Sequence, residues 1–268
     1  MATFQGKNIV ITGGSDGIGK ELVMQFLSLG AKVATCGRNP QKLEDLQKAC
    51  ANEHLMVFTA DVSKKEDCEA FVKAALQKLG GIDVLINNAG ISMRALVSEV
   101  KVETLQQVMD INFWGTVYTT MAALPSIKDR NGVVVGVSSI AGYRGLPGRS
   151  GYSASKYALN GWLEALKTEL YGSGTHVMWV CPGFTASNIR YAALNKDGAS
   201  QGETPMDEGK MMSAEECATH ILSAIEKKKR TLVLTFTGKR AVFLNRFFPS
   251  LADKLVHKFY FRNGKLIR

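Results

Sequence analysis

The chain has 268 residues, of which 46% are hydrophobic and 21% are charged, so it can bury a sizeable core and we exclude a disordered protein. No run of about 18 uncharged apolar residues occurs, so we expect no membrane-spanning helix. Of the net charge of +9, residues 227–268 contribute twelve basic side chains and one acid, which leaves −2 for the first 226 residues. The basic character therefore belongs to the C-terminal segment.

Apolar runs of strand length alternate with amphipathic segments of helix length. The predicted strands are residues 7–13, 32–37, 55–61, 83–87, 132–138, 176–181 and 231–236. The predicted helices are residues 17–30, a helix opened by Pro40, and residues 64–79, 102–124, 152–170 and 213–227. Such alternation needs right-handed crossovers, which give a doubly wound α/β fold. We predict a seven-stranded parallel, Rossmann-like sheet in a single domain, residues 1–237, followed by a basic amphipathic C-terminal extension, residues 238–268.

The cysteines and histidines show no ligand pattern. The five cysteines, at positions 36, 50, 68, 181 and 217, form no Cys-x-x-Cys pair, and the four histidines lack the spacing of a zinc site. We therefore expect no metal site and expect reduced, mostly buried thiols. The sequence opens without a signal peptide, so the expected location is cytoplasmic.

A glycine-rich segment, Thr12-Gly-Gly-Ser-Asp-Gly17-Ile-Gly19, joins the first predicted strand to the first helix. Glycines permit a tight turn there, and they let a pyrophosphate approach the helix N-terminus, whose free N–H groups favour anions. The spacing is G-x-x-x-G-x-G rather than G-x-G-x-x-G. We predict that this turn binds a dinucleotide.

The end of the second strand predicts which dinucleotide binds. An acid there would bind the ribose hydroxyls of NAD, whereas an arginine accommodates the 2′-phosphate of NADP. Arg38 and Asn39 occupy this position, with no acid nearby. Guanidinium is the preferred partner of phosphate, so we predict NADP(H) over NAD(H). Asp16, inside the glycine segment, opposes this prediction because its carboxylate would weaken 2′-phosphate binding.

Further motifs follow the later strands: Asn87-Asn-Ala-Gly90 after the fourth, Ser139 after the fifth, and Tyr152-Ser-Ala-Ser-Lys156 in the next helix. Tyr152 and Lys156 are four residues apart, which places both side chains on one helix face. Together with the glycine segment, these motifs resemble the short-chain dehydrogenase/reductase family, over nearly the whole chain up to about Phe236. The resemblance implies an oxidoreductase that interconverts a ketone and a secondary alcohol.

The resemblance implies a catalytic tetrad of Asn112, Ser139, Tyr152 and Lys156. Tyr152 would be the general acid in reduction and the base in oxidation. Tyrosine has an ordinary pKa of about 10, and the Lys156 ammonium would lower the pKa of Tyr152. Ser139, preferred to Ser138 for its spacing from Tyr152, would hydrogen-bond the substrate oxygen. Asn112 would hold a water that links Lys156 to solvent.

The same resemblance implies the residues that contact the cofactor. Asp61 and Val62 would flank the adenine, and the segment from Pro182 would meet the nicotinamide. The full set is Gly13, Ser15, Asp16, Gly17, Ile18, Gly19, Arg38, Asn39, Asp61, Val62, Asn88, Ala89, Gly90, Tyr152, Lys156, Pro182, Gly183, Thr185 and Ser187.

Three loops would shape the substrate pocket: residues 91–97, 141–148 and 184–212, the last as a mobile lid. Their side chains are mostly apolar, with Met93, Leu96, Tyr143, Leu146, Phe184 and Ile189 as the expected walls and Arg94, Arg144 and Arg190 among them. We predict a hydrophobic ketone, such as a steroid or a long-chain 3-keto lipid. The alternative is a non-catalytic NADP(H)-binding sensor, against which the complete tetrad argues.

The extension carries apolar residues at helical spacing from Leu244 to Phe259, with basic residues on the other side and Pro249 dividing it. We favour packing on the same domain or on a partner subunit; the alternative is a peripheral contact with an anionic membrane. No pattern of interleaved basic and aromatic residues supports nucleic-acid binding. The family resemblance also implies a homodimer or homotetramer, formed through the helices at 102–124 and 152–170.

Overall fold

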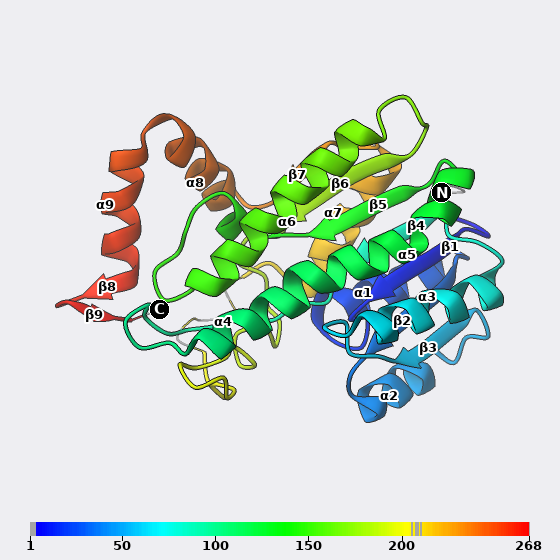
Figure 1. Ribbon diagram of the computed structural model, residues 1–268, viewed down its shortest axis with the longest axis horizontal. Coiled ribbons are helices and arrows are strands. Elements are labelled where there is room, and N and C mark those ends of the chain that lie inside the picture. Colours follow the sequence, from blue (N-terminus) through cyan, green and yellow to red (C-terminus); the bar gives the residue numbers. More distant parts are fainter. Residues whose placement is uncertain (1–3, 205, 207–208, 210, 268) are drawn as a thin grey trace.

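The structure is a computed structural model that describes residues 4–204, 206, 209 and 211–267. Seven parallel strands form one sheet in the order β3-β2-β1-β4-β5-β6-β7 (Figure 1). The strands are β1 (Asn8–Thr12), β2 (Lys32–Gly37), β3 (Leu55–Thr59), β4 (Val84–Asn87), β5 (Val133–Val137), β6 (His176–Cys181) and β7 (Thr231–Val233). The chain order reverses between β1 and β4, which opens a crevice at the carboxyl ends of these strands. The predicted doubly wound, seven-stranded fold is confirmed.

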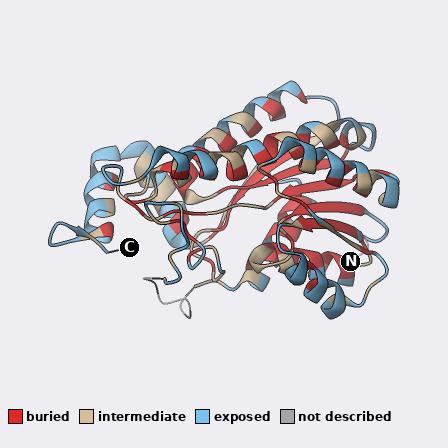
Figure 2. Cartoon of the chain, turned by 60° about the horizontal axis from the view of Figure 1, so that its bottom comes forward, coloured by how far each residue is buried: buried red, intermediate tan, exposed pale blue. Residues whose placement is uncertain are grey.

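Helices cover both faces of the sheet, and the strands between them are buried (Figure 2). Every residue of β1, β4 and β5 is buried, as expected for parallel strands covered on both sides. One apolar cluster packs α1 (Gly17–Ser28) and α7 (Ala214–Glu226) on one face. A second packs α3 (Lys65–Leu79), α5 (Gly115–Asp129) and α6 (Ser150–Glu169) on the other.

Local signals set the starts of the helices. Asn39 caps α2 (Pro40–Cys50) by accepting from the backbone N–H of Lys42, and Pro40 occupies the first turn as predicted. Ser213 caps α7 by accepting from Glu216 N at 3.0 Å. Four of the five cysteines are buried, and all five are unpaired.

Two elements differ from the sequence prediction. The single helix predicted over 102–124 is α4 (Val102–Met109), a π-helical turn η1 (Asp110–Trp114) and α5, which continues to Asp129. The seventh strand ends at Val233 rather than at residue 236, because Thr235 adopts a positive φ of 62° and its side chain caps α8 (Phe236–Phe247) at Gly238 N. Phe236 therefore begins a helix and is 82% exposed.

The C-terminal extension forms α8, α9 (Pro249–Tyr260) and a short hairpin, β8 (Phe261–Arg262) and β9 (Lys265–Leu266), at one end of the molecule (Figure 1). Asn245 donates to the Tyr143 carbonyl at 2.7 Å, and Arg144 pairs with Asp253. Many apolar side chains of the extension point outward, among them Phe243, Phe247, Phe248, Leu251 and Leu255. Within the described residues, every helix is too short or too polar to cross a bilayer.

Candidate active site

A cavity of about 460 Å³ follows the crevice at the carboxyl ends of the strands. Most of the predicted site residues line it: Gly13, Ser15, Asp16, Gly17, Ile18, Arg38, Asn39, Val62, Asn88, Ala89, Gly90, Ser139, Tyr152, Lys156, Pro182, Gly183, Thr185 and Ser187. Gly19, Asp61 and Asn112 do not line it. A Cβ at Gly19 would meet the Gly13 carbonyl oxygen at 2.2 Å, and Asp61 accepts from Ser63 instead.

The glycine turn lies unusually close to the loop after β4. Gly13 has a φ of 71°, and a Cβ there would lie 2.9 Å from the Ala89 Cα, so the position admits only glycine. The Thr12 hydroxyl accepts from the backbone N–H groups of Asn88 and Ala89 at 3.1 and 3.0 Å. This cradle of backbone at the start of α1 fits the pyrophosphate of a dinucleotide.

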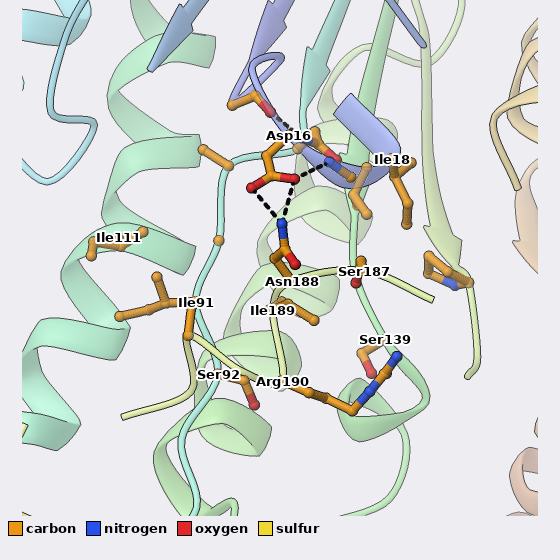
Figure 3. Close-up of a pocket in the computed structure, with 18 of the residues that line it drawn as sticks. Asp16, Ile18, Ile91, Ser92, Ile111, Ser139, Ser187, Asn188, Ile189 and Arg190 are labelled. Atoms are coloured by element: carbon orange, nitrogen blue, oxygen red, sulfur yellow. Dashed lines mark hydrogen bonds between the residues drawn. The ribbon is translucent and has the colours of Figure 1, made fainter. Parts of the chain in front are cut away.

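Asp16 is compensated by two residues that the sequence analysis did not identify. Its carboxylate accepts from Lys42 Nζ at 2.5 Å. It also accepts from Asn188 Nδ2 at 3.0 Å (Figure 3). Burial raises the pKa of Asp16, but the bonds from Lys42 and Asn188 outweigh it and hold that pKa below its usual value. Because Lys42 balances the Asp16 charge, the exposed Arg38 at the same end of the cavity supplies net positive charge.

Lys156 and Tyr152 lie one turn apart on α6. Lys156 is only 4% exposed, and its Nζ lies 5.7 Å from the Tyr152 ring centroid and donates to the Val137 carbonyl at 2.9 Å. Burial lowers the pKa of Lys156 to about 8. Burial also raises the pKa of Tyr152, against the opposing effects of the Ser139 hydroxyl and nearby arginine charge. The sequence analysis expected a lowered pKa for Tyr152. In the structure the pKa of Tyr152 is raised instead, because desolvation outweighs those effects.

The structure distinguishes the two candidate serines. Ser138 is 3% exposed and donates to Asn160 Oδ1 at 2.6 Å, so its hydroxyl is committed to the core. Ser139 begins a 3₁₀ turn, and its hydroxyl accepts from Ala141 N at 3.1 Å while the residue lines the cavity beside Tyr152. Ser138 lines the cavity as well, so the hydroxyl that is not committed to Asn160 is that of Ser139, and its role toward the substrate oxygen stays a prediction.

Asn112 is fully buried in the π-helical turn η1. Its Oδ1 accepts from Ile91 N at 2.8 Å, and its Nδ2 donates to Ile91 O and to Ser155 Oγ, both at 2.9 Å. These bonds fix the loop after β4 against α6. In this structure the Asn112 side chain thus holds the walls of the site, and its predicted role in a water path stays a prediction.

The far end of the cavity is mostly apolar, with Ile91, Leu146, Phe184, Ile189 and Tyr260 among its walls. Met93, Leu96 and Tyr143, expected as walls, lie outside it. Arg94 pairs with Glu203, and Arg144 pairs with Asp253, which leaves Arg190 as the one expected arginine that lines the cavity.

Arg149 and Tyr260 also line this end, although the sequence analysis named neither. Arg149 lies three residues before Tyr152, a spacing that places both on one side of the helix start. The sequence analysis could have identified Arg149 from this spacing. Tyr260 comes from the far end of α9, so only the tertiary fold brings it to the site.

The sequence model described as "short chain dehydrogenase" matches residues 7–197. The chain belongs to this family. Dehydrogenase/reductase SDR family member 7B of Mus musculus is 36% identical over 256 residues, which cover 92% of this chain and 79% of that protein. The 11-beta-hydroxysteroid dehydrogenase 1A of Arabidopsis thaliana is 33% identical over 238 residues, covering 84% of this chain and 67% of that protein.

A solved short-chain dehydrogenase/reductase from Burkholderia phymatum, in complex with NAD, has the same fold. It superposes with a TM-score of 0.84 at 23% identity and covers 99% of this chain and 98% of its own. As a member of the short-chain dehydrogenase family, the present chain is an NAD(P)-dependent oxidoreductase that acts on CH–OH groups.

Proposed function

We propose that this short-chain dehydrogenase uses NADP(H) to interconvert an apolar ketone and its secondary alcohol. The placement of Ser139, Tyr152 and Lys156 at the apolar end of the cavity carries the proposal. When bound, the nicotinamide supplies the hydride in reduction and accepts it in oxidation. The chain must then bind the substrate, orient its carbonyl and move one proton.

Tyr152 donates that proton to the carbonyl oxygen in reduction and recovers it in oxidation. Ser139 donates a hydrogen bond to the same oxygen and so orients the carbonyl. Lys156, buried 5.7 Å from the Tyr152 ring, stabilises the phenolate that remains after the proton leaves. Asn112 keeps the loop of Ile91 in place through its two bonds to that residue's backbone.

The charges at the other end of the cavity support NADP(H). Arg38 and Lys42 line this end, and Asp16 is the acid that faces them. Since Lys42 is paired with Asp16 at 2.5 Å, Arg38 is available to a 2′-phosphate. The Burkholderia protein has the same fold and is in complex with NAD, so the proposal of NADP(H) depends on these local charges and not on the fold.

The apolar walls and the printed name of the Arabidopsis relative, a hydroxysteroid dehydrogenase, support a hydrophobic substrate. The loop over residues 184–212, of which 205, 207, 208 and 210 lie outside the described residues, is the proposed lid. Asn188 ties it to Asp16 in the glycine turn, and Ile189 lines the cavity. Closing this loop would complete the substrate site and the cofactor site together.

Exposed apolar side chains on two different surfaces support two proposed interactions, one with a second copy of the chain and one with a membrane. Trp114, Met121 and Tyr157 are 42%, 65% and 46% exposed on η1, α5 and α6, where the proposed homodimer or homotetramer would form. On α8 and α9, exposed apolar side chains lie among basic ones, which suits a cytoplasmic protein held peripherally on an anionic membrane.

The decisive experiment measures NADPH and NADH consumption across a panel of carbonyls graded from small diketones to steroids and 3-keto lipids. We expect NADPH-dependent turnover that rises with substrate apolarity. Tyr152→Phe should keep NADPH binding and lose at least about 100-fold in kcat. Tyr171→Phe, at a residue 92% exposed, is the matched control and should leave turnover unchanged. NADPH binding without turnover of any carbonyl would contradict the reductase and favour the sensor.

A further inference from the structure

Arg149 places a positive charge beside the catalytic tyrosine without an acidic partner among the described residues. Its Nη1 donates to Ser92 Oγ at 3.1 Å. Its Nε is buried and has no hydrogen-bond partner. Ser92 is itself 2% exposed, so this part of the guanidinium is held away from solvent. Arg149 as a whole is half-exposed and lines the cavity, so the rest of its guanidinium can meet an anion that enters there.

A second arginine lines the same cavity, from the loop after β6. Arg190 is 8% exposed, and its Nη2 donates to the Thr185 carbonyl at 2.6 Å. Figure 3 shows Arg190 and Ser92 at the same end of the pocket as Ser139, away from Asp16. Arg190 makes a further interaction of its own, so the main anion contact is assigned to Arg149.

Both arginines act electrostatically on Tyr152, since the charge of each lowers the pKa of its hydroxyl. They therefore lie near the atom that exchanges a proton with the substrate. The cofactor's phosphates belong elsewhere, because the glycine turn, Arg38 and Lys42 mark the opposite part of the cavity. The anion that meets Arg149 must then belong to the substrate.

The remaining walls at this end constrain the rest of the substrate. Ile91, Leu146, Phe184, Ile189 and Tyr260 offer apolar surface. A small polar acid would leave this surface in contact with water. A molecule that combines an apolar body with one acidic group fits both parts of the site.

We propose that the substrate is an apolar keto acid, a 2-oxo or 3-oxo acid whose carboxylate binds Arg149, with Arg190 as the second cation. The planar guanidinium donates two parallel hydrogen bonds to a carboxylate, which sets the carbonyl against Ser139 and Tyr152. In reduction the hydride goes to the carbonyl carbon and the Tyr152 proton to its oxygen, so a hydroxy acid forms and the carboxylate is unchanged. This proposal rests on the proposed function and narrows its substrate class.

The test compares each keto acid with its methyl ester, which keeps the carbonyl and the apolar body but removes the charge. Suitable pairs are benzoylformate and 3-oxooctanoate with their methyl esters, each assayed with NADPH. We expect the acids to be preferred by at least about 10-fold in kcat/KM, the effect of one charge-assisted hydrogen bond. Arg149→Gln should lower kcat/KM for the acids by about 10- to 100-fold, mainly through KM, and leave the esters nearly unchanged.

Arg240→Gln is the matched control, because it removes the same charge from the exposed surface of α8. This substitution should leave kcat/KM unchanged for both the acids and the esters. Equal turnover of acid and ester by the unaltered protein would overturn the proposal. An equal loss for both substrates in Arg149→Gln, with a shifted pH profile, would also overturn it, since Arg149 would then act only on Tyr152.

A binding measurement separates this proposal from the proposed function. Calorimetry with the hydroxy acid product, mandelate, and NADP⁺-loaded protein should show binding that Arg149→Gln weakens about 10-fold or more. If no ketone is turned over but this Arg149-dependent binding persists, the reductase fails and the acid site stands. If ketones are reduced but mandelate and 3-hydroxyoctanoate do not bind, the acid site fails and the reductase stands.

Discussion

Reversing the charge of Arg38 should change which nucleotide the protein binds. In the structure Arg38 and Lys42 are cations at the glycine-turn end of the cavity, and Lys42 is paired with Asp16. The net local charge is therefore about one positive unit, contributed by Arg38. Arg38→Asp converts it to about one negative unit and places a carboxylate where it can accept hydrogen bonds from ribose hydroxyls.

The size of the effect follows from the exposure of Arg38. A hydrogen bond to a charged group contributes about 1.5–3 kcal/mol, and the lower end applies to an exposed side chain, so losing it costs about 10-fold in affinity. Setting a carboxylate about 4 Å from the phosphate adds about 1 kcal/mol of repulsion in water, another factor of about five. NADPH affinity should therefore fall about 50-fold, whereas NADH affinity should hold or rise.

Dissociation constants for both nucleotides can be measured from the change in their fluorescence on binding. Arg240→Asp is the control, since it makes the same charge change on the exposed surface of α8. The effect of Arg38→Asp should shrink as salt increases, because exposed charges are screened. An NADPH-to-NADH affinity ratio that is the same in the original protein, Arg38→Asp and Arg240→Asp would refute the reasoning.

Three further predictions concern the catalytic lysine, the glycine turn and the core. The kcat/KM for reduction should fall as pH rises through about 8, because Lys156 is an ammonium below that pKa and loses its charge above it; the pH profile of Lys156→Met should lack this limb. Gly13→Ala should abolish NADPH binding in a fluorescence titration, since its Cβ would lie 2.9 Å from the backbone of the loop after β4; Gly80→Ala, which has a similar positive φ but no atom within 4 Å, should retain binding. Phe71→Ala, at a fully buried side chain, should lower the free energy of unfolding in urea by about 3–5 kcal/mol. Phe247→Ala, at a residue 58% exposed, should change that free energy by about 0.5 kcal/mol or less.

The sheet could be predicted because its strands are uniform apolar runs between turn residues, a pattern that depends on local sequence. The two errors arose where local apolar character was ambiguous. Leu234, Thr235 and Phe236 continue the apolar run of β7, yet the positive φ of Thr235 turns the chain into α8. The π-helical turn around Asn112 is likewise set by that side chain's bonds to Ile91, which no helical periodicity encodes.

The site was predictable to the extent that its residues belong to short motifs. The glycine turn, Ser139, Tyr152 and Lys156 could all be found by spacing. Lys42 and Asn188 could not, because they meet Asp16 from 26 and 172 residues away. The direction of the Tyr152 pKa shift could not be predicted from the sequence either. It depends mainly on burial of the hydroxyl, which only the packing of separate loops determines.

Through contacts with Tyr143 and Arg144, the C-terminal extension acts as a structural brace for the loop of residues 141–148, which follows Ser139. The Tyr143 carbonyl accepts from Asn245 of α8, its hydroxyl accepts from Trp179 of β6, and the neighbouring Arg144 pairs with Asp253 of α9. Shortening the chain before α8 would release this loop only a few residues from Ser139. Loss of turnover in a truncated protein would therefore say nothing about membranes. Substitutions on the outer surface of the extension that spare these contacts, such as Phe243→Ser, test the proposed membrane contact by itself.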